Sequence, residues 1–218
     1  MIDECERASR SEPVHKLASL PRDTINSILI RRGIAAENVE EVTSLLATAG
    51  SPLTAEQVIA YSFERHDDRT PPFGVGRFGD GNDYPVYYSA IEEETCISEV
   101  RHHARKSFEA MQSGELPYPR FYQYVSSAFN GLTLTLCGHE GAHPELVSAD
   151  ESGYPFCQSL ARQALAQGIS AFHAPSARHD GGVCVPVFMQ QALSNHRSGC
   201  FVMFAARNGQ IEHQKIGD

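Results

Sequence analysis

Residues 74–100 read GVGRFGDGNDYPVYYSAIEEETCISEV and combine three kinds of local pattern. A glycine-rich turn carries Arg77, and its glycines allow the backbone to adopt conformations that other residues resist. An aromatic segment with strand character contains Tyr87 and Tyr88, and an acidic segment with helical character leads to Glu99. A basic, an aromatic and an acidic side chain therefore lie close together in the sequence, which makes this stretch a candidate functional site.

The chain after Gly74 contains more short strands than helices. Apolar or alternating segments bounded by Gly, Pro, Ser or Asn predict strands, and they cover residues 84–90, 121–127, 132–137, 169–174, 183–188 and 200–206. Two helices are expected among them, one from about Glu93 through residue 114 and one over 155–168. Because strands and helices do not alternate regularly, the pattern predicts an α+β fold rather than a doubly wound sheet.

The first 70 residues have a helical pattern. Three segments, 23–33, 36–50 and 51–66, show apolar residues at helical spacing or a glycine at their end. The third also opens with Thr54 and Gln57 at the spacing of a capping box. The charged and proline-containing segment that follows suggests a boundary, so we expect a helical N-terminal extension over 1–70 and a second domain over 71–218.

Composition excludes several classes of function. The chain has 18 basic and 27 acidic residues and a formal charge of −9, which argues against a nucleic-acid surface but not against small anions. No apolar run approaches the ~20 residues that span a bilayer, and the polar N-terminus lacks a secretory signal. The six cysteines form no C-x-x-C pair and fit buried thiols in a reducing compartment. We therefore expect a cytoplasmic protein, or one exported without a classical signal, that does not bind membranes.

The individual signals in residues 74–100 are ambiguous. A G-x-G-x-x-G pattern fits Gly74, Gly76 and Gly79, but no strand precedes it and no helix follows it directly, so a dinucleotide-binding fold is rejected. An ordinary glycine turn with a surface arginine is an equal alternative. Glu99 lies on the flank of an apolar helical face, where either a solvated position or an inward position with a partner is possible.

Residues 172–182, FHAPSARHDGG, form a predicted turn after a strand. Ser176 and Arg178 could there bind phosphate or ribose oxygens, although this segment taken by itself favours an ordinary polar loop. His139 and His143 are spaced like zinc ligands on a helix, but the neighbouring glycines and proline disfavour a helix, so no metal is expected. The sequence also lacks the G-x-S-x-G motif of a serine nucleophile.

Taken together and in order, these motifs resemble the RES-domain proteins. The resemblance rests on the glycine turn with Arg77, on PVYYSA at 85–90, on ETCISEV at 94–100, on CQSLARQALAQG at 157–168, and on the strand and turn at 168–188, and it extends over about 73–206. Members of this family are the toxins of bacterial toxin–antitoxin pairs and degrade NAD. The resemblance implies a mixed β core with flanking helices, similar to the mono-ADP-ribosyltransferases, with NAD in a central cleft.

The family motifs imply specific roles. Arg77 would pair with the pyrophosphate of NAD. Tyr88 would stack against the nicotinamide ring, while its neighbour Tyr87 would point to the other face of the strand. Glu99 would stabilise the positive charge that develops on the ribose.

Two further positions follow from the same resemblance. Ser176 would hydrogen-bond the nicotinamide ribose or amide. Arg178 is either a second phosphate contact or a structural charge. Cys184 stands where many members of the family have asparagine, and this departs from the family pattern.

The acceptor of the ADP-ribosyl group decides the activity. Phosphate would make the enzyme an NAD phosphorylase, water an NAD glycohydrolase, and a protein side chain a mono-ADP-ribosyltransferase. The resemblance favours destruction of free NAD, a cognate antitoxin as partner, and self-association. Two alternatives stay open: an exported NADase effector with an immunity protein, and a non-catalytic nucleotide-binding module.

Overall fold

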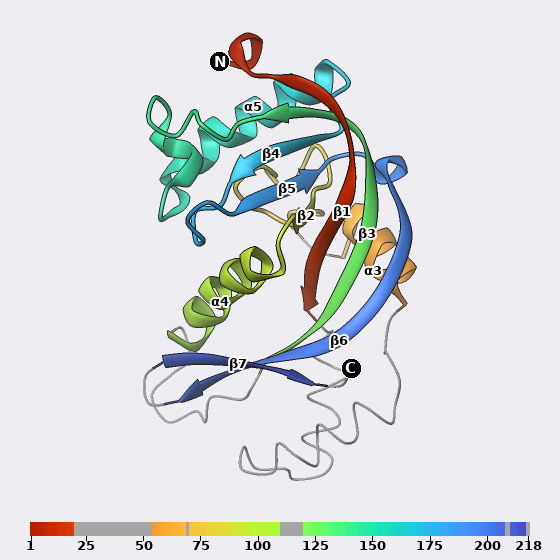
Figure 1. Ribbon diagram of the computed structural model, residues 1–218, viewed down its shortest axis with the longest axis vertical. Helices are drawn as coiled ribbons and strands as arrows, with labels where there is room; N and C mark the ends of the chain where they lie inside the picture. Colours follow the sequence, from red (N-terminus) through yellow and green to blue (C-terminus); the bar gives the residue numbers. More distant parts are fainter. Residues whose placement is uncertain (20–53, 69, 110–119, 208–209, 217–218) are drawn as a thin grey trace.

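The structure is a computed structural model that describes residues 1–19, 54–68, 70–109, 120–207 and 210–216. The described part of the chain contains one curved mixed sheet with helices packed around it (Figure 1). Its strands are β1 (Arg7–Ser19), β2 (Tyr87–Ala90), β3 (Arg120–Thr135), β4 (Ala171–Pro175), β5 (Val183–Val187), β6 (Leu193–Arg207) and β7 (Gln210–Ile216). Its α-helices are α3 (Ala55–Phe63), α4 (Glu93–Glu109) and α5 (Tyr154–Ala166). Its 3-10 helices are η1 (Ile2–Glu4), η3 (Pro144–Val147), η4 (Glu151–Gly153) and η5 (Gln190–Ala192).

The sheet has the strand order β1-β2-β5-β4-β3-β6-β7, and β1 also pairs with β3. This extra pairing joins the first five strands into a closed, barrel-like arrangement, beyond which β6 and β7 continue. Within the sheet, β3 pairs in parallel with β4, and the other pairs are antiparallel. In Figure 1, β1, β3 and β6 run beside one another as long curved strands. The expected mixed α+β fold is confirmed at this level.

The N-terminal segment differs from the sequence-based expectation. Residues Arg7–Ser19 form β1, which pairs with β3 over its whole length, so the prediction of a helical extension is wrong for these residues. The predicted helices over 23–33 and 36–50 lie outside the described residues. The third predicted helix is present as α3, and its capping box is formed in both directions, with Thr54 Oγ1 accepting from the Gln57 amide at 3.2 Å. The boundary between residues 70 and 71 remains a prediction.

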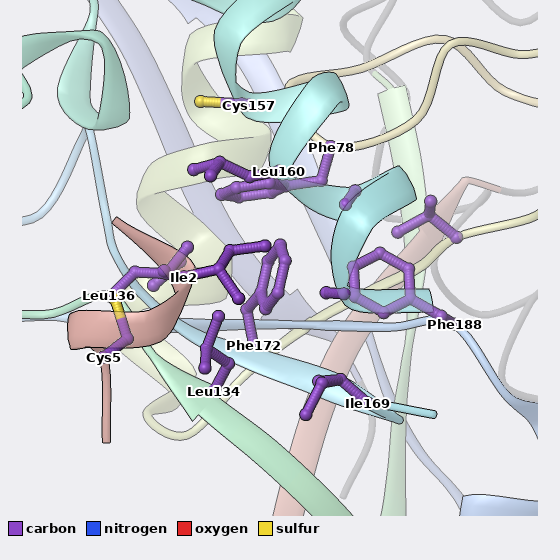
Figure 2. Close-up of a cluster of buried hydrophobic side chains, with 14 of the residues drawn as sticks. Ile2, Cys5, Phe78, Leu134, Leu136, Cys157, Leu160, Ile169, Phe172 and Phe188 are labelled. Carbon is purple, nitrogen blue, oxygen red and sulfur yellow. The ribbon is translucent and has the colours of Figure 1, made fainter. Parts of the chain in front are cut away.

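The main core lies between the sheet and α5. Its buried side chains come from both ends of the chain (Figure 2) and include Ile2, Phe78, Leu134, Leu136, Cys157, Leu160, Phe172 and Phe188. Phe172 makes edge-to-face contacts with Phe78 and Phe188 at ring-centroid distances of 5.3 and 5.0 Å, a geometry that aromatic pairs prefer. The core therefore fixes α5 and the segment around Phe78 on one side of the sheet.

Helices α4 and α3 pack on opposite faces of β1, where Leu17 belongs to the cluster of α4 and Ala18 to that of α3. Helix α4 contributes Cys96, Ile97 and Ala104 to a second cluster that also contains buried residues of β1, β2 and β6. Helix α3 packs Ala55 and Val58 against β1 and β3. No helix in the described part of the chain is both long enough and apolar enough to cross a membrane. The fold thus brings α4 and α5 to the same face of β2, because Tyr88 packs against the cluster of α5 and Ala90, two residues further on, belongs to the cluster of α4.

Candidate functional site

The glycine turn that carries Arg77 is closed by reciprocal backbone hydrogen bonds between Gly76 and Gly79, at 2.9 and 3.3 Å. A Cβ atom on Gly76 would lie 2.5 Å from the Tyr88 hydroxyl oxygen, so only glycine fits there. Arg77 Nη1 donates hydrogen bonds to the carbonyl oxygens of Leu146 and Pro175, the latter at 2.9 Å. The turn therefore aims Arg77 at the end of β4, directly before Ser176.

Helix α5 holds this turn from behind. Gln158 Nε2 donates to the carbonyl oxygens of Gly76 and Gly79 at 3.0 and 3.3 Å. A salt bridge of 2.8 Å between Arg162 and Asp80 ties the same helix to the end of the turn. The local sequence around Gln158 indicates only a helix and does not predict this contact.

Tyr88, on β2, contacts the glycine turn of Arg77. Its hydroxyl oxygen accepts a hydrogen bond from the Phe78 amide at 3.1 Å, and removal from water raises its pKa. Tyr87 is fully buried in a separate cluster with Val14 and Phe129. Successive side chains of a strand point to opposite faces, so of the two tyrosines Tyr88 lies on the side of Arg77.

Glu99 on α4 meets the loop after β4. Ser176 Oγ donates to Glu99 Oε1 at 2.7 Å, and Cys184 Sγ on β5 lies 3.4 Å from the same oxygen as a further donor. The Ser176 hydroxyl oxygen accepts from the amides of Arg178 and His179, each at 3.1 Å. Because these two amides occupy the acceptor sites of the hydroxyl, its single hydrogen is directed to Glu99.

Cys184 is a weakly acidic neighbour of Glu99. Cys184 is only 7% exposed, and burial together with the charge of Glu99 raises the pKa of its thiol. The thiol therefore stays protonated at neutral pH and acts as a weak hydrogen-bond donor rather than as a nucleophile. In the sequence, Cys184 stands out only as a departure from the family pattern.

The backbone amide of Arg178 binds Ser176, whereas its side chain has a different partner. Its Nη2 atom donates to the carbonyl oxygen of Ala149 at 2.8 Å. The pKa of His102 on α4 is lowered, by burial first and then by the charge of Arg178. The pKa of Tyr154 at the start of α5 is raised, mainly by burial, with smaller effects of several charges that include Arg178, Arg77 and Glu99.

The structure brings the four main predicted residues into one chain of contacts. Arg77 binds the carbonyl of Pro175, Ser176 binds Glu99, and Tyr88 supports the turn of Arg77. These residues come from a turn, β2, α4 and the β4–β5 loop, which the closed sheet gathers at one place.

The described residues contain no group of three His, Cys, Asp or Glu side chains that could hold a metal ion. His143 instead stacks on Phe156 at a ring-centroid distance of 5.3 Å. All six cysteines are free, and Cys5, Cys96, Cys157 and Cys184 are buried. The residues gathered around Glu99 therefore offer a carboxylate, hydroxyl and guanidinium groups, which suit a polar organic or phosphate-bearing ligand.

Comparison with known proteins gives one finding that covers most of the chain. The family model of the RES domain matches residues 55–207. This range contains Arg77, Tyr88, Glu99, Ser176 and Arg178. No curated protein matches the chain significantly.

Proposed function

Because the chain belongs to the RES domain family, we propose that it is a toxin-type enzyme that cleaves the nicotinamide–ribose bond of NAD and depletes the NAD pool. The family is consistent with a toxin-type function related to NAD. The observation that supports the proposal most is the hydrogen bonding of the two oxygens of the Glu99 carboxylate. Oε1 accepts both hydrogen bonds described above, whereas Oε2 accepts none from the part of the chain that the structure describes.

A carboxylate with one free oxygen suits this reaction. When the bond between the nicotinamide nitrogen and ribose C1′ breaks, its electron pair leaves with nicotinamide, which becomes neutral, and positive charge develops on the ribose. An oriented carboxylate stabilises such an oxocarbenium-like state. Ser176 holds Glu99 through Oε1, so Oε2 is available for a ribose hydroxyl or for the developing charge. An oxygen of the acceptor then forms the new bond to C1′.

The other residues supply binding. Arg77 is anchored through Nη1 alone, and a guanidinium has five N–H donors, so donors remain for the pyrophosphate of NAD. The ring of Tyr88 is only partly buried and can stack on the positively charged nicotinamide. Arg178 can add a phosphate contact if its side chain leaves the carbonyl of Ala149.

The acceptor and the cellular setting are parts of the same proposal. Phosphate or water as acceptor would make the protein an NAD phosphorylase or an NAD glycohydrolase, and no metal enters the reaction. An enzyme that destroys NAD endangers the cell that makes it, so a cognate antitoxin in the cytoplasm is the proposed partner.

The test is NAD consumption by the purified protein with and without inorganic phosphate. We expect Glu99→Gln to lower the rate by about 100- to 1,000-fold, because the amide is neutral and cannot stabilise positive charge. Glu94→Gln, at an exposed position of the same helix, is the matched control and should leave the rate unchanged. Phosphate dependence would identify phosphorolysis. An inactive wild type, or an active Glu99→Gln variant, would contradict the proposal.

A further inference from the structure

A buried hydrogen-bond network lies beside the candidate site and has no part in the chemistry proposed above. Its centre is Thr95, which is fully buried in the first turn of α4, one helical turn before Glu99. Thr95 Oγ1 donates to Glu92 Oε2 at 2.7 Å and lies 2.8 Å from His179 Nδ1 in the β4–β5 loop. We call Glu92, Thr95 and His179 the Thr95 network.

The bonding of Thr95 fixes the state of His179. A hydroxyl group has one hydrogen, and here it goes to the Glu92 carboxylate. His179 Nδ1 must therefore carry a proton and donate it to Thr95 Oγ1, which fixes this tautomer in the neutral ring. Burial acts to raise the pKa of Glu92, but the hydrogen bonds from Thr95 and the Val183 amide outweigh it and lower that pKa. Glu92 is therefore ionised and can accept both bonds.

The Thr95 network also binds the other end of the β4–β5 loop. Glu92 Oε2 accepts from the Val183 amide, the first residue of β5, at 3.1 Å. Within the loop, the Ser176 amide donates to the Gly182 carbonyl at 2.8 Å, and the Gly182 amide donates to the His179 carbonyl at 3.0 Å. The loop that carries Ser176 is thus closed on itself and attached to α4 at His179 and at Val183.

The fit at this attachment is tight. A Cβ atom on Gly182 would lie 2.4 Å from Thr95 Oγ1 and 2.7 Å from His179 Nδ1, both far below van der Waals contact. The absence of a side chain at Gly182 allows the loop to approach the helix this closely. The network has one arrangement in which all of its donors are satisfied, and that arrangement leaves little freedom between loop and helix.

Because α4 carries Glu99 and the loop carries Ser176, we infer that Glu92, Thr95 and His179 are positioning residues that set the Ser176–Glu99 hydrogen bond and the direction of the free oxygen of Glu99. None of the three contacts the atoms of the proposed reaction. They act through the backbone of the loop and the first turn of the helix. The kinetic part of this inference rests on the proposed NAD-cleaving function, while its structural part does not.

The decisive pair of variants is Thr95→Val and Thr95→Ser. Valine keeps the shape of threonine but removes the hydroxyl, whereas serine keeps the hydroxyl. A misplacement of about 1 Å in a catalytic group can cost about 100-fold in rate, so we expect Thr95→Val to lower kcat by about 10- to 100-fold. The KM for NAD should change little, because α5 holds the glycine turn that carries Arg77, and Thr95→Ser should retain most of the activity. Equal kcat values for the two variants would overturn the inference.

A second measurement does not depend on activity. Amide hydrogen exchange, resolved by residue with NMR, reports on the Arg178, His179 and Val183 amides, which donate to Ser176 and Glu92. We expect these amides to exchange faster in Thr95→Val than in Thr95→Ser, while core amides such as that of Phe172 keep their protection. Unchanged exchange in Thr95→Val would overturn the inference even if the wild type proved unable to cleave NAD. If the wild type did not cleave NAD but these amides still exchanged faster in Thr95→Val, only the proposed function would be refuted.

If Thr95→Val fails to fold, substitutions of His179 provide the same contrast. His179 is partly exposed, so its replacement spares the core. His179→Asn places an amide donor close to the position of Nδ1, whereas His179→Ala has none. We expect the asparagine variant to keep both the kcat and the loop protection, and the alanine variant to lose both. The same behaviour in the two variants would overturn the inference.

Discussion

At the scale of single residues, the two oxygens of Glu99 have different surroundings. Oε1 is engaged by Ser176 and by the thiol of Cys184, and the thiol is the weaker donor. The carboxylate is thereby oriented by groups that cannot themselves neutralise it. Glu99 is therefore oriented through Oε1 and can present Oε2 to a ligand.

Lys16 leads to a prediction at the same scale. Its Nζ donates to the Tyr88 carbonyl at 3.3 Å and lies 4.7 Å from the ring centroid of Tyr87. Removal from water lowers its pKa to about 8, although a nearby Cys96 acts in the opposite direction. Between about pH 8 and the ordinary lysine pKa of about 10.4, the unfolded chain binds more protons than the folded chain, so stability from this group rises with pH.

The measurement is urea unfolding of the wild type and of Lys16→Met from about pH 7 to pH 10. Because methionine does not titrate, the free energy of unfolding of the wild type should increase relative to that of the variant as the pH rises. Other groups that titrate in this range affect both proteins equally and cancel in the difference. Parallel curves for the two proteins would show that Lys16 keeps an ordinary pKa.

At the scale of elements, each helix beside the site positions one charged residue. Helix α4 carries Glu99 directly, and its first turn is bonded to the β4–β5 loop. Helix α5 carries none of the predicted site residues but holds the glycine turn of Arg77 through Gln158. The glycine turn and Glu99 are thus supported by different helices, and a variant in one support should affect one kinetic parameter more than the other.

Gln158→Leu tests the support from α5. It removes two neutral hydrogen bonds, each worth about 1 kcal/mol, from the turn that aims Arg77 at the proposed pyrophosphate position. We expect the KM for NAD to rise roughly tenfold, with a smaller change in kcat, as measured by steady-state kinetics. Gln163→Leu, at an exposed position of the same helix, should behave like the wild type. A fall in kcat at constant KM would contradict the assignment of Arg77 to binding.

Local sequence patterns predicted the elements that form from local interactions. The capping box of Thr54 and the apolar spacing of α4 and α5 are confirmed. Strand β1 was missed because RASRSEPVHKLAS is polar and contains a proline, and its strand conformation depends on pairing with β3, more than 100 residues away in sequence. Strand β7 was missed because its sequence QIEHQKI is polar, and it forms by pairing with the preceding strand β6.

The difference between features visible in local sequence and features that depend on distant contacts also applies to the site. The motifs around Arg77, Tyr88, Glu99 and Ser176 were recognisable in order along the chain, and the structure brings them together. The contacts of Thr95 with His179 and of Gln158 with Gly76 join residues 84 and 82 positions apart. Such contacts leave no periodic or compositional trace in the sequence, so only the folded chain reveals them.

At the scale of the whole molecule, β1 closes the sheet on which the site is built. It pairs with β3 along its full length and with β2 at His15. Its buried residue Val14 packs in a cluster with Tyr87 and Phe129. Since β2 also carries Tyr88, the N-terminal strand should fold together with the catalytic domain as one cooperative unit, rather than as a separate extension.

Val14→Ala tests this unit. Loss of two buried methyl groups should lower the free energy of unfolding by about 1–2.5 kcal/mol. Because the chain lacks tryptophan and has eight tyrosines, tyrosine fluorescence and far-UV circular dichroism are the two probes, and both should shift to the same lower urea midpoint. Ser9→Ala, at an exposed position of β1, should remain within about 0.5 kcal/mol of the wild type. If unfolding instead showed two transitions and Val14→Ala shifted only one of them, β1 would fold separately. The sheet would then close only after the rest of the domain has formed.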